Sequence, residues 1–172
     1  MKIIDKNSLD ALLAVSHVRP RLRRELKYNP QDIDWDTLDF LVVTTAAQDK
    51  GVLIVPNDAG YYVAEFDGRR RPKATGNGRI KAAICDICYT WRAGGGVTTI
   101  TFPLNKGERS VGVMACLDLQ CSHHVRGLTN AARVSRAQLP ENLTVEQRVD
   151  RLNSRLHDLL ERISAEYIQF DP

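Results

Sequence analysis

Four cysteines within 37 residues are the side chains of this sequence whose type and spacing predict a defined chemistry. Two residues separate Cys85 from Cys88, and four separate Cys116 from Cys121. A C-x2-C turn brings two thiolates within bonding distance of one ion, and a second close pair completes a tetrahedral shell. Zinc prefers four-coordinate thiolate sites and has no redox chemistry. We therefore predict one structural Zn2+ held by these four cysteines.

The second cysteine pair leaves alternatives open. A C-x4-C spacing is less diagnostic than C-x2-C, so His123 competes with Cys121 as the fourth ligand, and we assign Cys121. Four unrelated buried thiols, an iron site or a redox switch are the competing interpretations of the whole cluster. His123 and His124 beside Cys121 also fit a Cys/His catalytic pair, but adjacent side chains point apart on most backbones. Four protein ligands leave zinc no open position, so we expect a protein that is not an enzyme.

Secondary-structure patterns around the cysteines predict how they are positioned. Residues 97–102 and 110–114 are strand-like, and residues 104–107 supply a turn between them. The sequence that begins at Cys121 is typical of a short helix. A cysteine knuckle, a hairpin and a ligand at a helix start form the arrangement of a treble-clef zinc finger. Residues 94–96 are glycines that let the chain leave the knuckle tightly, with a phosphate-binding loop as the alternative.

Helices are predicted at the start of the chain. Ser8 is expected to cap a first helix, and Pro20 to begin a second one that ends by Pro30. Leucines at helical spacing follow both starts. Residues 35–41 predict one or two further helical turns, although residues 42–45 favour a strand.

A β-hairpin and a long helix complete the expected elements. Residues 52–55 and 61–66 are predicted strands on either side of a turn that contains Pro and Gly. Thr144 and Gln147 match a capping box, in which their side chains satisfy free backbone N–H groups reciprocally. The helix is expected over residues 144–168, with one apolar face. That face consists of Val145, Val149, Leu152, Leu156, Leu159, Ile163 and Tyr167.

Charge is distributed unevenly along the chain. The net charge of +3 combines −3 over residues 1–68, +8 over residues 69–135 and −2 over residues 136–172. Four thiolates and one Zn2+ reduce the central +8 by two, to +6. Residues 69–81 carry six cations and no carboxylate, which indicates either a solvated connection or a basic loop that attracts an acidic partner.

These patterns predict an α+β protein with N-terminal helices and a β-hairpin, a treble-clef zinc finger and a long C-terminal amphipathic helix. We expect two domains: residues 1–80 with the basic linker, and residues 81–172 with the finger and the last helix. No run of residues approaches the roughly 18–20 apolar positions that span a bilayer. Asp5 and Lys6 interrupt any secretory signal, so a cytoplasmic location with reduced thiols is expected.

Three segments together resemble a known family. Residues 84–97, 110–121 and 125–127 resemble the C-terminal treble-clef zinc finger of elongation factor G-binding proteins, the FusB-type fusidic-acid-resistance family often labelled FBP. The resemblance covers residues 82–128, and the helix at 144–168 also suits the family. It implies a cytoplasmic, non-enzymatic protein whose finger binds elongation factor G and modulates its release from the ribosome.

Aromatic and basic residues near the finger are candidate contacts for this partner. Tyr89, Trp91 and Arg92 follow the knuckle, and aromatic residues with Arg are the usual composition of binding hot spots. Packing against the finger's own hairpin is the alternative role for these three. Arg126 either contacts the partner or caps the carbonyls of its short helix. The full set of candidate contacts is Tyr89, Trp91, Arg92, Lys106, Arg109 and Arg126.

The alternative function is that of an RNA- or ribosome-binding zinc protein, because a basic finger also suits nucleic acid. Aromatic residues make up only 6% of the chain and form no run of stacking positions among the cations, which weighs against it. Elongation factor G is therefore the expected partner, ribosomal RNA the second choice, and no membrane partner is expected.

Overall fold

The computed structural model describes residues 1–70, 82–92, 95–104, 107–130 and 141–170 of the chain. They fall into two compact units. The N-terminal unit comprises residues 1–68, 101–111 and 160–172, and the finger unit comprises residues 69–100 and 112–159. The predicted basic loop at residues 69–81 lies outside the described residues from residue 71 onward.

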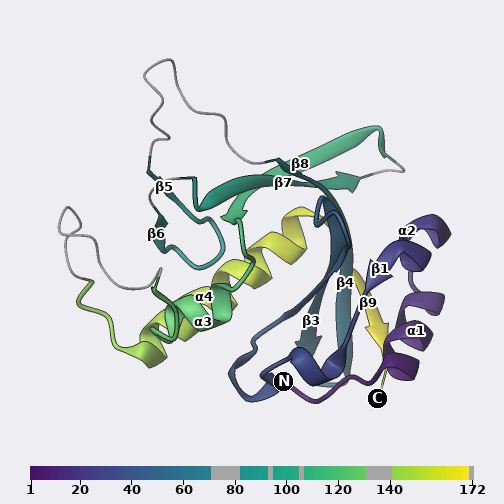
Figure 1. The fold of residues 1–172 in the computed structure, drawn as a ribbon, viewed down its shortest axis with the longest axis horizontal. Coiled ribbons are helices and arrows are strands. Elements are labelled where there is room, and N and C mark those ends of the chain that lie inside the picture. The colour runs from purple at the N-terminus through teal and green to yellow at the C-terminus, as the bar shows by residue number, and fades with distance from the viewer. Residues whose placement is uncertain (71–81, 93–94, 105–106, 131–140, 171–172) are drawn as a thin grey trace. The chain divides into compact units, whose positions relative to one another are not determined.

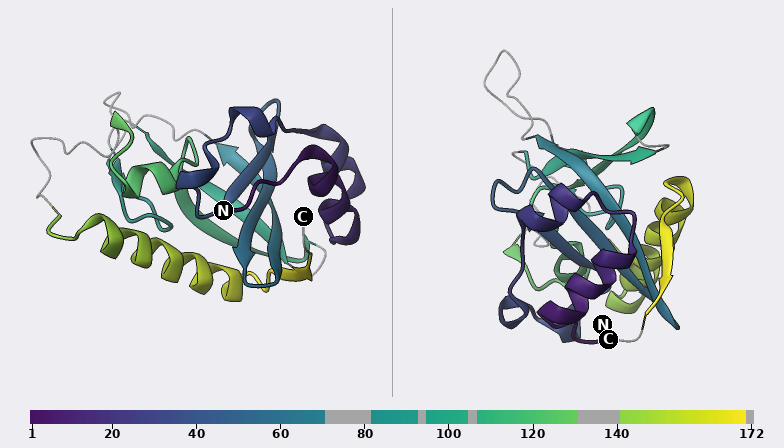
Figure 2. Two further views of the ribbon diagram at one scale, coloured as in Figure 1. Left: turned by 90° about the horizontal axis from the view of Figure 1, so that it is seen from below. Right: turned by 90° about the vertical axis from the view of Figure 1, so that its right-hand side faces the viewer.

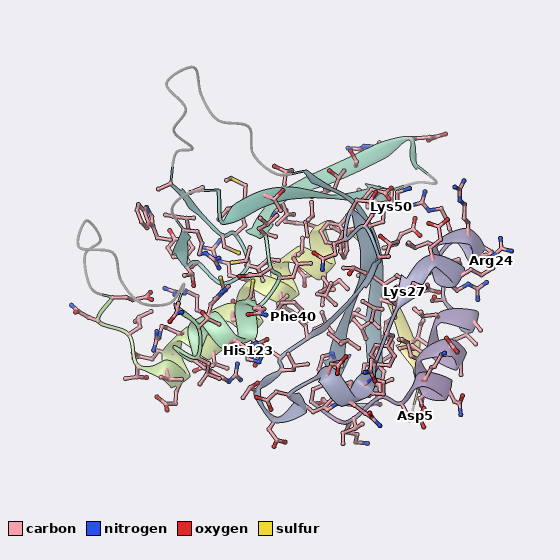
Figure 3. The ribbon with its side chains drawn as sticks, in the orientation of Figure 1. Asp5, Arg24, Lys27, Phe40, Lys50 and His123 are labelled. Atoms are coloured by element: carbon pink, nitrogen blue, oxygen red, sulfur yellow. The ribbon has the colours of Figure 1, made fainter. Side chains whose placement is uncertain are left out.

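Two helices open the N-terminal unit: α1 (Lys6–Val15) and α2 (Pro20–Glu25). The predicted cap at Ser8 is wrong, because Asp5 precedes α1 in an extended conformation and its Oδ1 accepts a hydrogen bond from the Ser8 N–H at 2.7 Å (Figure 3). Helix α2 begins at Pro20 as predicted but ends at Glu25. Its predicted end is wrong because Leu26–Lys27 form a short strand, β1.

An antiparallel sheet follows the helices. The predicted hairpin is confirmed as β3 (Lys50–Asn57) and β4 (Gly60–Arg70), which pair from Lys50 opposite Asp67 to Asn57 opposite Gly60. The β-prone residues before the hairpin form β2 (Leu41–Thr45). The helical turns predicted over 35–41 are reduced to one 3-10 turn, η2 (Trp35–Thr37), because pairing with β3 extends the chain from Leu41. A further 3-10 turn, η1, spans Pro30–Asp32.

The remaining strands and one short helix surround the cysteines in sequence. The predicted hairpin at 97–114 is confirmed as β7 (Val97–Leu104) and β8 (Arg109–Cys116), and residues 105–106 of its turn lie outside the described part. Strands β5 (Ala83–Ile84) and β6 (Trp91–Arg92) form a separate two-stranded sheet (Figure 1). Helix α3 (Cys121–Val125) begins where predicted. The main sheet has the order β1-β2-β3-β4-β7-β8, with β9 paired to β4.

The core of the N-terminal unit lies between α1, α2 and one face of strands β2–β4, as Figure 2 shows. Leucines at helical spacing face inward from the helices, and alternate residues of the strands meet them. The contributing side chains are Ile4, Leu9, Leu12, Leu13, Val18, Leu22, Trp35, Leu41, Val43, Val52, Ile54, Tyr61 and Val63.

The C-terminal helix α4 spans Val145–Arg162. Its capping box is confirmed: the Gln147 N–H donates to Thr144 Oγ1 at 3.3 Å, and the Thr144 N–H donates to Gln147 Oε1 at 2.9 Å. The predicted continuation to residue 168 is wrong. Ser164 has a φ of 47°, and the chain then forms β9 (Glu166–Gln169), in which Tyr167 pairs with Tyr62 of β4.

The residues that the structure describes include no helix that is both long and apolar enough to cross a membrane.

Candidate metal centre

The first cysteine pair lies in a tight knuckle between β5 and β6. The Tyr89 N–H donates to the Cys85 carbonyl at 2.9 Å, and the Cys85 N–H donates to the Thr90 carbonyl at 3.1 Å. The Cys88 N–H points at the Cys85 sulfur, with N and Sγ 3.5 Å apart. The backbone of the knuckle thus directs both thiols inward and supplies one hydrogen bond to the first of them.

The second cysteine pair joins a strand to a helix. Cys116 is the last residue of β8 and Cys121 the first residue of α3. The turn between them is held by a hydrogen bond from the Leu119 N–H to the Cys116 carbonyl at 3.0 Å. The Leu117 N–H also donates to the Gly96 carbonyl at 2.9 Å, which fixes the turn to the chain that leaves the knuckle. A strand end and a helix start therefore present the two thiols together.

The four sulfur atoms form one buried cluster. Each Sγ lies within 4.8 Å of the others, and each cysteine is at most 1% exposed. Cys85 Sγ lies 3.8 Å from Cys121 Sγ, and Cys88 Sγ lies 3.5 Å from Cys116 Sγ. A tetrahedral ion with Zn–S bonds of about 2.3 Å requires S–S separations of about 3.8 Å. The donor set and its spacing therefore fit one structural Zn2+.

The competing fourth ligand is excluded from this geometry. In the described part of the chain, the groups able to hold an ion include Cys121 but not His123. Residues 121 and 123 are two positions apart on α3, so their side chains leave the helix in nearly opposite directions, and Cys121 is the one directed at the other thiols.

The charges of the thiols are interdependent. Hydrogen bonds from Cys116 and then Cys121 lower the pKa of Cys88 far below that of a free thiol. Hydrogen bonds with Cys116 and then Cys85 raise the pKa of Cys121 well above that of a free thiol. Without a cation, this buried site can therefore ionise only some of its thiols, and a bound divalent ion stabilises all four thiolates.

Three further side chains surround the cluster. Arg92 Nη1 lies 2.7 Å from His124 Nε2, and Arg92 Nη2 donates to Asp118 Oδ2 at 3.1 Å. Burial acts against the charge of His124, but hydrogen bonds to Asp118 and Cys88 outweigh it and raise its pKa to about 9. Burial likewise acts against ionised Asp118, but the contact with His124 holds its pKa at about 2. The cationic guanidinium of Arg92 therefore lies beside thiolates whose total charge exceeds that of Zn2+.

Cys116, Asp118 and His124 form a second group whose ligand atoms lie within 4.8 Å of one another. Two observations argue against a second ion there. Cys116 already belongs to the four-cysteine cluster, and the guanidinium of Arg92 contacts both Asp118 and His124. A cation would be repelled by that guanidinium, so these residues support the first site instead.

The predicted partner contacts have different environments. Trp91 is half-buried in β6, and Arg109 is exposed at the start of β8. The side chain of Arg92 is only 13% exposed and is turned toward the metal centre. Arg126 Nη1 donates to the Ser122 carbonyl at 2.9 Å, which is the helix-capping role predicted as its alternative. Lys106 lies outside the described residues.

Tyr89 has the most informative surroundings of the predicted contacts. It is 45% exposed, and the guanidinium carbons of Arg151 and Arg155 each lie 5.0 Å from its ring centroid. Sequence reasoning missed these two arginines as neighbours of the knuckle, and it also missed Asp118 and His124 as neighbours of the cysteines. Asp118 and His124 lie close to Cys116 and Cys121 in sequence, and this proximity was the signal that could have identified them.

A model of the FBP C-terminal treble-clef zinc-finger family matches residues 18–163. The match extends well beyond the segment at 82–128 on which the resemblance was based. No curated protein and no solved structure matches the chain. The family match covers most of the sequence and includes all four cysteines of the buried cluster. The chain therefore belongs to the FBP C-terminal treble-clef zinc-finger family, with one structural zinc bound by Cys85, Cys88, Cys116 and Cys121.

Proposed function

We propose that this protein is a non-enzymatic factor that binds translation elongation factor G through its zinc finger and modulates release of that factor from the ribosome. The observation that carries the proposal is the closed metal centre, in which four buried cysteines fill the coordination shell of zinc. It lies in a chain of the FBP C-terminal treble-clef zinc-finger family. Four buried thiolates leave zinc no position for water or substrate, so the metal supports a binding surface and not a reaction.

The finger unit offers an apolar surface for such a partner. Ile84 is 42% exposed and Met114 is 40% exposed. Ile84 lies directly opposite Trp91 in the β5–β6 pair. The Asp86 N–H donates to the Met114 carbonyl at 2.7 Å, and the Met114 N–H donates to Asp86 Oδ2 at 2.8 Å, which ties the knuckle to β8.

We call Ile84, Trp91 and Met114 the finger face. Exposed apolar side chains beside an aromatic residue are typical of the cores of protein interfaces. Zinc holds the strands of Ile84 and Met114 in place, because Cys85 directly follows β5 and Cys116 is the last residue of β8. The finger face is therefore the surface proposed to contact elongation factor G.

Calorimetry of the zinc-loaded protein with elongation factor G tests this function. We expect a complex to form at micromolar concentrations. The double variant Ile84→Asp/Met114→Asp should lose affinity by about tenfold or more. A tenfold loss is only about 1.4 kcal/mol, which the removal of two apolar interface contacts readily supplies. Ile3→Asp is the matched control, since Ile3 is 65% exposed and lies in the N-terminal unit.

Release is tested separately by sedimenting ribosomes with bound elongation factor G in the presence and absence of this protein. We expect less factor in the ribosomal pellet when the wild-type protein is added. Absence of binding to the purified factor at micromolar concentrations contradicts the proposal. Binding without any effect on the pellet retains the partner but contradicts the role in release.

A further inference from the structure

Tyr89 occupies a backbone conformation that is unfavourable for its residue type. Its φ of 61° lies in the left-handed region, where glycine is strongly preferred over a bulky side chain. Tyr89 directly follows Cys88 and closes the knuckle with its N–H, so the turn requires this conformation. An aromatic residue held at such a position, with an exposed ring, indicates a role for the ring beyond folding of the turn.

Two arginines of α4 approach the ring. Arg151 and Arg155 are one helical turn apart, and both guanidinium carbons lie 5.0 Å from the centroid of Tyr89. Arg148 precedes Arg151 by three residues and so lies on the same side of α4. Like charges at these spacings repel one another, so an anion that pairs with the guanidinium groups would relieve this repulsion.

The carboxylates on and beside α4 neutralise this row only in part. Glu146 and Asp150 stand at helical positions directed away from the row, whereas Asp158 follows Arg155 by three residues and lies on the same side of α4 as the row. Glu141, which precedes the helix, forms an ion pair with Arg151 Nη1. The Nε of Arg151 is buried and has no hydrogen-bond partner in the part of the chain the structure describes. Three arginines therefore lie beside two carboxylates, Glu141 and Asp158, and the row keeps a net positive charge.

We infer that Tyr89, Arg148, Arg151 and Arg155, here called the ring–arginine surface, bind single-stranded RNA. Guanidinium groups pair with phosphate oxygens through two parallel hydrogen bonds, and an exposed aromatic ring stacks on any base. An acidic protein would pair with the guanidinium groups but would have no base to stack on the ring of Tyr89. This surface does not include the finger face and does not depend on binding of elongation factor G.

Fluorescence anisotropy of a labelled oligouridine of about 12 nucleotides, a length within the range bound by single-stranded RNA modules, tests the inference. Three phosphate contacts predict a slope of about −2 for log affinity against log salt concentration, at roughly 0.7 per contact. Arg151→Gln/Arg155→Gln leaves one contact, so we expect the slope to fall to about −0.7 and the affinity at low salt to fall with it.

Two variants control this result. Arg21→Gln/Arg24→Gln removes the same charge from α2, where both side chains are exposed and Arg24 points away from the helix (Figure 3). We expect it to leave the slope unchanged. Tyr89→Gly places the preferred residue at a left-handed position, so we expect zinc content and melting temperature to be retained. It should keep the salt slope but weaken binding roughly 5- to 150-fold, the loss of one stacked base.

Three outcomes overturn the inference. An equal loss of affinity in both double arginine variants indicates nonspecific attraction. An unchanged affinity in Tyr89→Gly excludes stacking. Binding of poly-glutamate as tightly as oligouridine assigns the surface to an acidic protein instead of RNA. Arg151→Gln/Arg155→Gln should still bind elongation factor G, so a failure of this inference is distinguishable from a failure of the proposed function.

Discussion

Replacement of Arg92 by alanine should weaken zinc binding without removing a ligand. The guanidinium is 13% exposed, lies 2.7 Å from His124 Nε2 and donates to Asp118 Oδ2 at 3.1 Å. It also lies close enough to Cys116 for the two groups to interact electrostatically. Removing it leaves four thiolates and one Zn2+, a net charge of −2, in a buried site with one cation fewer.

The expected loss in zinc affinity is about 10- to 100-fold, the usual effect of removing a partner that surrounds metal ligands. This corresponds to about 1.4–2.7 kcal/mol. The ion pair with Asp118 supplies only a minor part, because that carboxylate is 36% exposed and solvent screens such pairs to about 1 kcal/mol or less. Most of the effect must come from the charge beside the thiolates and from the orientation of His124.

Competition with a chromogenic zinc chelator measures this loss for wild type, Arg92→Ala and Arg92→Lys. We expect the lysine variant to be intermediate, because it retains the charge but not the planar fork that reaches two partners. Gly96→Ala gives an independent perturbation, since a Cβ there would lie 2.8 Å from Arg92 Nε. Affinities of Arg92→Ala and wild type that agree within twofold would refute the reasoning.

Three further predictions concern the stability of the fold. Leu156→Ala should cost about 2–5 kcal/mol in urea denaturation, because Leu156 is 1% exposed on the apolar face of α4; a cost well below that range contradicts its place in the core. Thr144→Ala should cost about 1 kcal/mol, and Thr144→Ser should restore most of it; equal stabilities of the two variants would rule out a role for the hydroxyl. Burial and then the charge of Asp5 raise the pKa of Tyr28 to about 12 from 10.0, so the neutral phenol favours the folded state. The contribution of this phenol to the free energy of unfolding is complete below pH 10.0 and declines as pH rises toward 12, and solvent limits it to about 1 kcal/mol. The difference in unfolding free energy between wild type and Tyr28→Phe should therefore shrink over this pH range, and a constant difference contradicts the prediction.

Local patterns predicted those elements whose stabilising contacts are close in sequence. The capping box at Thr144 needs only a partner three residues away, and both formed hydrogen bonds as expected. The hairpin of β3 and β4 needs only a short turn between two apolar runs. Where a distant segment competes, local patterns failed. The apolar stripe that predicted helix up to Tyr167 is consistent with α4 as far as Leu159, but the helix ends at Arg162 and pairing with β4 places Tyr167 in β9.

The cysteine spacing by itself predicted one structural metal site, and the strand and helix patterns around it predicted a treble-clef finger, because a tetrahedral thiolate shell needs its ligand pairs close in sequence. Only the tertiary structure decided that Cys121 and not His123 completes the shell, since this depends on the direction of each side chain from α3. It also decided that Arg92 supports the metal centre while Tyr89 meets two arginines of α4. Such contacts join residues far apart in the chain, and charge or composition counted along the sequence does not specify which of them meet.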